Sequence, residues 1–193
     1  MERGVQEGIK AEAWQTDTCV GDWYYKRGIQ YKTPTTVIRM LVDIVSKNGN
    51  LLLNFPVRAD GTLDAEEESI LASLAEWISV NGEAIYGTRS WKVYGEGATG
   101  VSSGSFNEEK LRYTAEDIRF TTRGGNLYAI ARGWPESGKL TVRSLGGANI
   151  HSIRLLGIQE PLKWSRGTQG LVVQLPPQKP VKHAFSLRLE GAA

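Results

Sequence analysis

Residues 50–55 read NLLLNF, a short and continuous run of apolar side chains between two segments with helical periodicity. Such runs are typical of strands that are buried on both faces, and parallel strands of α/β proteins are the usual case. A helix, a buried strand and a second helix in succession form the repeat of a βα architecture. We therefore predict that the first half of the chain belongs to a parallel α/β fold.

The helix before this run is expected to begin at Thr33 and to end near Lys47. Thr33 is a suitable N-cap, and Pro34 takes the first helical position, where its missing N–H is not needed. Lys47 in the last turn and Gly49 beyond it are helix-ending signals. The apolar face repeats at intervals of three and four residues and comprises Val37, Ile38, Leu41, Val42 and Val45.

The helix after the run is expected to follow a turn over residues 56–61. Asp64 opens it, the glutamates at 66–68 complement the helix dipole, and the pair at 81–82, Asn-Gly, ends it. Its predicted apolar face comprises Ile70, Leu71, Leu74, Trp77 and Ile78.

An aromatic-rich stretch over residues 9–31 precedes both helices and has no clean periodicity, so it predicts a strand end followed by a long loop. Exposed loops that are dense in aromatic side chains are often binding surfaces. The alternative is that these rings cover a core. The aromatic residues are Trp14, Trp23, Tyr24, Tyr25 and Tyr31.

After about residue 90 the pattern changes to a Gly/Ser-rich segment, GEGATGVSSGSFNEE, and then to short alternating segments separated by turn signals. This pattern predicts a linker and an antiparallel β-sandwich. We place the domains at 1–92 and 93–193. The predicted strands cover 118–122, 126–132, 139–144, 150–155, 170–175 and 184–189.

The first domain holds only two or three βα elements, too few to close a (β/α)8 barrel. Either this unit pairs with something absent from the sequence, or its buried strand is exposed. We therefore expect the chain to be incomplete, and the exposed apolar surface around Leu51 to Phe55 to favour a partner. That partner is either a second copy, in a homo-oligomer, or the missing half of the barrel.

The composition excludes several other classes of protein. A net charge of +2 does not indicate a nucleic-acid partner, and no apolar run is long enough to cross a membrane. The single cysteine, Cys19, excludes an internal disulfide or a zinc site of several thiolates, and no metal site is expected. The start of the chain carries no signal peptide, which leaves the compartment open.

Five carboxylates lie near the start of the chain, and glycoside hydrolysis uses a pair of carboxyl groups, roughly 5 to 5.5 Å apart when configuration is retained. Spacing in a loop cannot identify such a pair, and ordinary surface exposure is an open alternative for each. These residues are Glu2, Glu7, Glu12, Asp17 and Asp22.

Several long motifs in order resemble the carboxy-terminal part of α-L-fucosidases of glycoside hydrolase family 29. They are WQTDTCVGDWYY, MLVDIVSKNGNLLLN, ADGTLD, EWISVNGEAIYGTRSW, LLGIQEPLKW and LVVQLPPQKP. The resemblance implies the terminal part of a catalytic (β/α)8 barrel followed by a β-sandwich. It also implies retaining hydrolysis of terminal α-L-fucosyl residues, with L-fucose or a fucosylated glycan as the ligand and no cofactor.

The resemblance also implies roles for individual residues. Arg3 matches an arginine that touches the fucose or steadies the nucleophile, and Trp23 matches an aromatic residue near the pocket. Asn54 ends the predicted last barrel strand, where it binds substrate or anchors a loop. The nucleophilic aspartate of the family has no match here, and the acid/base glutamate falls in a variable loop that makes Glu12, and then Glu7, the candidates.

Three functions stay open at this point. The chain is a fucosidase fragment that is inactive alone, a carbohydrate-binding or interaction module, or one half of a split enzyme that another chain completes.

Overall fold

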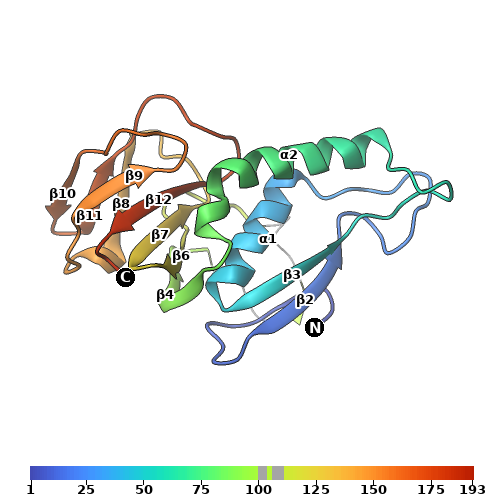
Figure 1. The fold of residues 1–193 in the computed structure, drawn as a ribbon, viewed down its shortest axis with the longest axis horizontal. Helices are drawn as coiled ribbons and strands as arrows, with labels where there is room; N and C mark the ends of the chain where they lie inside the picture. The colour runs from blue at the N-terminus through green and yellow to red at the C-terminus, as the bar shows by residue number, and fades with distance from the viewer. Residues whose placement is uncertain (100–103, 106–110) are drawn as a thin grey trace.

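The computed structural model describes residues 1–99, 104–105 and 111–193. Figure 1 shows a small parallel β-sheet at one side, two helices in the middle and a β-sandwich at the other side. The helices therefore contact both the parallel sheet and the sandwich. Within the described ranges, no helix is both long enough and apolar enough to span a membrane.

Helix α1 (Pro34–Ser46) begins as predicted, because the Thr33 side chain accepts a hydrogen bond from the Thr36 N–H. Its end differs slightly from the prediction. Asn48, with φ of 69°, makes the left-handed turn that ends the helix, and Gly49 is already the first residue of the next strand. Gly49 is required for close packing instead, since a Cβ there would lie 2.6 Å from the Trp14 ring.

Helix α2 (Ala65–Asn81) is also confirmed at both ends. Asp64 and Glu67 form a reciprocal capping box at its start, and a short 3-10 turn, η1 (Gly82–Ala84), follows its last residue. Trp77 is buried on the face that packs against the sandwich. The predicted apolar face is not fully covered, because Leu71 remains 46% exposed.

Strand β3 (Gly49–Asn54) contains the NLLLN run and pairs in parallel with β2 (Trp14–Cys19), as predicted for an α/β fold. Within this chain alone the strand is not buried on both faces, which agrees with the expectation that a barrel remnant exposes apolar surface on this strand. Leu53 packs towards the helices, whereas Leu52, on the opposite face, is 57% exposed. The helices cover one face of the pair, and the other face is open in this structure.

The amino-terminal segment extends this parallel arrangement. Glu2 forms an isolated parallel bridge with Asp17 of β2. The next residues then form β1 (Gly4–Val5), which pairs with the short strand β5 (Gly104–Ser105).

All six predicted strands of the second half are present. They are β6 (Ile118–Arg123), β7 (Asn126–Ala131), β8 (Lys139–Val142), β9 (Ser152–Leu155), β11 (Gly170–Gln174) and β12 (Phe185–Glu190). A 3-10 turn, η3 (Arg143–Leu145), follows β8.

Two further strands of the sandwich were not predicted, β4 (Arg89–Glu96) and β10 (Trp164–Gly167). Both are edge strands of their sheets. Neither alternates between buried and exposed residues, and the register of β4 shifts between Ser90 and Gly95. Edge strands that bury little apolar surface leave a weak signal in the sequence.

The sandwich consists of a five-stranded antiparallel sheet, in the order β4-β6-β7-β12-β9, and a three-stranded sheet, β10-β11-β8. Strand β7 shows how the layers are held together. Leu127, Ala129 and Ala131 face the core between the two sheets, whereas Tyr128 and Ile130 face α1 and α2. The five-stranded sheet is therefore the middle layer, and it is buried on both faces.

The proposed domain boundary between residues 92 and 93 stays a prediction, and it falls within β4. The predicted linker over 95–109 lies partly outside the described residues.

Candidate functional site

The carboxyl ends of β2 and β3 lie next to the amino-terminal segment, and Arg3 is placed there by its backbone. The Arg3 N–H donates to the Asp17 carbonyl at 2.8 Å, and the residue adopts a left-handed conformation with φ of 44°. This conformation is unusual for a residue other than glycine. It turns the chain so that the guanidinium lies beside Cys19, with an Nη2–Sγ distance of 3.1 Å.

Trp23 packs against the Arg3 guanidinium, which lies 5.1 Å from the centre of the ring. The indole Nε1 donates to the Glu2 carboxylate at 3.1 Å. Since 37% of its surface stays exposed, Trp23 is held in place and still presents an aromatic surface to a ligand.

Asn54 stands at the end of β3 and fixes the loop that carries Trp23. Its Nδ2 donates to the carbonyls of Asp22 and Trp23, at 3.3 and 3.4 Å. Of the two roles that the sequence left open, the anchoring of a loop is the one that these contacts show.

Asp22 links the charges of this edge. Its carboxylate lies 2.6 Å from the Lys26 ammonium and 3.7 Å from the Arg3 guanidinium. The hydrogen bond from Lys26, with a second from the Trp23 N–H, holds the pKa of Asp22 below its usual value. Asp22 is therefore ionised at neutral pH, and it helps to orient Arg3 beside the Trp23 ring.

The structure brings Arg3, Trp23 and Asn54 together, but it does not bring Glu7 or Glu12 to them. Both glutamates are exposed. They lie in the loop that returns to the other end of the sheet, where the Lys10 N–H donates to the Lys47 carbonyl and the Asn48 side chain donates to the Lys10 carbonyl. Their assignment as acid/base candidates stays a prediction.

Glu2, Asp22 and Lys26 also belong to this edge. The sequence placed Glu2 and Asp22 among five carboxylates near the start of the chain but assigned neither a role, and it did not single out Lys26. Asp22 could have been assigned to the site, because it follows the end of the strand that contains Cys19 and barrel sites lie at strand carboxyl ends. Glu2 carried no such signal. Across residues 1–99, 104–105 and 111–193, no three His, Cys, Asp or Glu side chains form a metal-binding group.

Two family models match the chain, one for α-L-fucosidase over residues 1–83 and one for the α-L-fucosidase carboxy-terminal domain over residues 110–190. Human tissue α-L-fucosidase is 32% identical over 195 residues, which is 96% of this chain and 38% of that protein. Human plasma α-L-fucosidase is 35% identical over 180 residues, which is 86% of this chain and 35% of that protein. The chain thus spans less than two fifths of the length of these relatives.

Solved structures of α-L-fucosidases have the same fold over nearly the whole chain. The Thermotoga maritima α-fucosidase in complex with fucose has a TM-score of 0.77 at 24% identity, covering 94% of this chain and 40% of that one. Isoenzyme 1 from Paenibacillus thiaminolyticus has a TM-score of 0.77 at 24% identity, covering 98% and 44%.

Proposed function

Since the chain belongs to the α-L-fucosidase family, glycoside hydrolase family 29, we propose that it supplies the terminal part of a catalytic (β/α)8 barrel together with the β-sandwich. The proposed reaction is the retaining hydrolysis of terminal α-L-fucosyl residues of a fucosylated glycan. One observation supports this most directly: Arg3, Trp23 and Asn54 come from three segments and meet at the carboxyl ends of parallel strands. Barrel enzymes build their active sites at this end of the strands.

Each of these residues has a physical role in the proposed reaction. A retaining glycosidase forms a covalent glycosyl-enzyme intermediate on a carboxylate, and that carboxylate comes from outside these 193 residues. The Arg3 guanidinium steadies such a carboxylate or a sugar hydroxyl by charge-assisted hydrogen bonds. The exposed surface of Trp23 packs against the apolar methyl side of fucose, and Asn54 keeps the Trp23 loop in place.

Three carboxylates are candidates for the acid/base residue, and they can be compared directly. Glu12 and Glu7 are proposed from the resemblance, and Glu2 is added because its carboxylate accepts the Trp23 Nε1 hydrogen bond at the carboxyl edge. A general acid protonates the leaving group, so its loss slows substrates with poor leaving groups most.

The proposed function is tested by hydrolysis of an aryl α-L-fucoside, with intact mass measured on the same sample. The purified chain alone is expected to be inactive, because loss of a covalent nucleophile lowers turnover by orders of magnitude. The chain fused behind the preceding barrel segment of human plasma α-L-fucosidase is expected to hydrolyse the substrate. If the chain alone were active, the nucleophile would have to lie within these 193 residues, and the proposal would be wrong. A folded fusion that binds L-fucose without hydrolysis would favour the binding module.

In the active fusion, the three carboxylate variants Glu2→Gln, Glu7→Gln and Glu12→Gln separate the candidates. The variant of the true acid/base is expected to lose activity towards an alkyl fucoside at least about 100-fold. It should keep far more activity towards a dinitrophenyl fucoside, whose leaving group needs no protonation. The two other variants serve as matched controls, and equal behaviour of all three would contradict the assignment to this group.

A groove of about 810 Å³ lies between β3 and the two helices, and its lining includes Leu51, Leu53, Phe55 and Leu74. We propose that the missing barrel half occupies it in an active enzyme. Apolar surface of this kind favours association when it is left open.

We accordingly expect the purified chain to self-associate in sedimentation velocity runs at high concentration. Leu71→Glu should weaken this association, because Leu71 of α2 lines the groove and is 46% exposed. Val93→Glu, at a position 38% exposed on β4, is the matched control and should leave it unchanged. A chain that remains a monomer at high concentration would contradict this prediction.

A further inference from the structure

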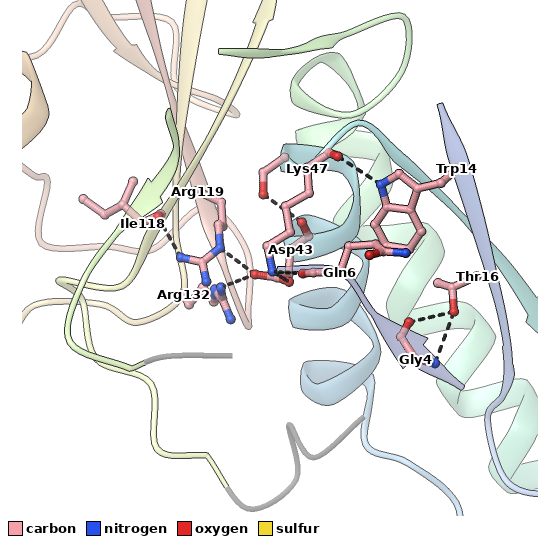
Figure 2. Close-up of polar contacts among 10 residues, drawn as sticks. Gly4, Gln6, Trp14, Thr16, Asp43, Lys47, Ile118, Arg119 and Arg132 are labelled. Atoms are coloured by element: carbon pink, nitrogen blue, oxygen red, sulfur yellow. Dashed lines mark hydrogen bonds and ion pairs between the residues drawn. The ribbon is translucent and has the colours of Figure 1, made fainter. Parts of the chain in front are cut away.

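A buried ionic cluster connects α1 to the five-stranded sheet (Figure 2). Its centre is the Asp43 carboxylate, which is fully buried. Arg119 of β6 donates to Asp43 Oδ1 at 2.7 Å, and Arg132, just beyond β7, donates to the same oxygen at 2.9 Å. Lys47, the C-cap residue that follows α1, lies 2.6 Å from Oδ2.

Lys47 makes a second contact that leads away from the sandwich. Its ammonium donates to the Gln6 carbonyl at 2.9 Å, and the residue is only 1% exposed. Gln6 lies three residues after Arg3, in the segment whose backbone is bound to β2 at Asp17 and Thr16. The Lys47 side chain therefore holds the far end of the segment that carries Glu2 and Arg3.

A lysine side chain is flexible, so the position of its ammonium depends on its partners. Here the Asp43 carboxylate directs it, and the guanidinium of Arg119 directs Asp43 in turn. Tyr94 of β4 lines the same space, with its ring centre 4.9 Å from Lys47 Nζ and 5.0 Å from Arg119 Cζ. In a buried site of low polarity, each of these contacts restricts the next one.

We propose that Arg119, Asp43 and Lys47 are positioning residues through which the β-sandwich fixes the segment that carries Arg3. The contacts run in the order Arg119, Asp43, Lys47 and the Gln6 carbonyl. The sandwich thereby acts on the carboxyl edge, although none of the hydrogen bonds and ion pairs of that edge among the described residues comes from a sandwich side chain. The importance of this for catalysis rests on the proposed function, but the physical coupling does not.

The coupling is tested by hydrogen–deuterium exchange of the purified chain, followed by mass spectrometry. Peptides that cover residues 3–12 report on the segment, and peptides from α2 report on global unfolding. Because Lys47→Met also removes a partner from the buried cluster, exchange is expected to rise about ten-fold more in residues 3–12 than in α2. Arg119→Gln should also raise exchange in residues 3–12 above that in α2, by about three-fold or more. Among the described residues, none of the hydrogen bonds and ion pairs of Arg119 reaches that segment.

Two control variants complete the test. Lys32→Met removes a lysine–carbonyl hydrogen bond of similar length, 3.0 Å from Lys32 Nζ to the Cys19 carbonyl, and should leave residues 3–12 unchanged. Arg119→Lys keeps the charge and should restore exchange to near that of the parent chain. If Lys47→Met fails to fold, the two Arg119 variants decide the question. The proposal is overturned if Arg119→Gln lowers the melting temperature while exchange in residues 3–12 stays the same, or rises only as much as in α2.

Discussion

Replacement of Asp43 by alanine is expected to lower the free energy of unfolding by about 3–5 kcal/mol, the usual effect of removing one partner from a buried ionic cluster. Among the described residues, three cationic side chains donate to this carboxylate, and Lys47, Arg119 and Arg132 are all nearly or fully buried. Without Asp43, three buried cations would face one another without the carboxylate that each of them binds. For a chain of this size the melting temperature should fall by roughly 10 °C in a calorimetric or circular dichroism scan.

The control for this substitution is Glu160→Ala, which removes a carboxylate from an exposed position and should change stability by less than about 0.5 kcal/mol. If both variants behaved alike, the ionic cluster would not stabilise the fold.

The ionisation of Asp43 also makes the stability of the fold depend on pH. Burial alone raises the pKa of Asp43, but Arg119, Arg132 and Lys47 outweigh burial and hold that pKa below its usual value. A carboxyl group with a lowered pKa in the folded state stabilises the protein at pH values above its unfolded pKa. This contribution is lost as the pH falls through the folded pKa. Asp43→Asn should therefore flatten the loss of stability in acid.

The second large effect is expected for Trp77→Ala, which should lower the free energy of unfolding by about 3–5 kcal/mol. Trp77 is 1% exposed and packs in the cluster between the helices and the five-stranded sheet. Its Nε1 also donates to the Ala184 carbonyl at 2.7 Å, so it fixes α2 to the segment that leads into β12. Its removal leaves a cavity and an unpaired buried carbonyl in the same place.

Trp77→Phe separates these two contributions, because it keeps most of the ring volume and loses the hydrogen bond. We expect it to lower stability by about 1–3 kcal/mol, which is the range for a buried polar group left without its partner. Chemical denaturation with urea measures both variants. Equal losses for Trp77→Ala and Trp77→Phe would show that packing at this position contributes little.

Local signals in the sequence predicted the elements with well-formed caps or clear alternation. Thr33 and Asp64 act as N-caps through their own side chains, so each helix start is encoded within four residues. The six predicted strands alternate or run apolar because they lie in the sandwich. The edge strands β4 and β10 escaped prediction, because neither has an apolar pattern of its own. Strand β4 is held by pairing with the distant β6, and β10 by a hairpin with the next strand, β11.

The candidate site was predicted only in part, for a related reason. Arg3, Trp23 and Asn54 were named from a resemblance, and their meeting at one edge depends on the parallel pairing of β2 with β3. Glu7 and Glu12 were named in the same way, but the path of their loop leads to the other end of the sheet. Loop residues have no fixed direction until their contacts are known.

By itself, the sequence determined the fold class, the helix starts, most of the strands and the family. These depend on periodicity, on capping side chains and on long ordered motifs, all of which are local in the chain. The tertiary structure alone decided which face of β3 is open, which carboxylates lie beside Arg3, and that Asp43 meets Arg119 and Arg132. The contacts of Asp43 with Arg119 and Arg132 join residues that are 76 and 89 positions apart in the chain. Their strength comes from burial, which no local pattern records.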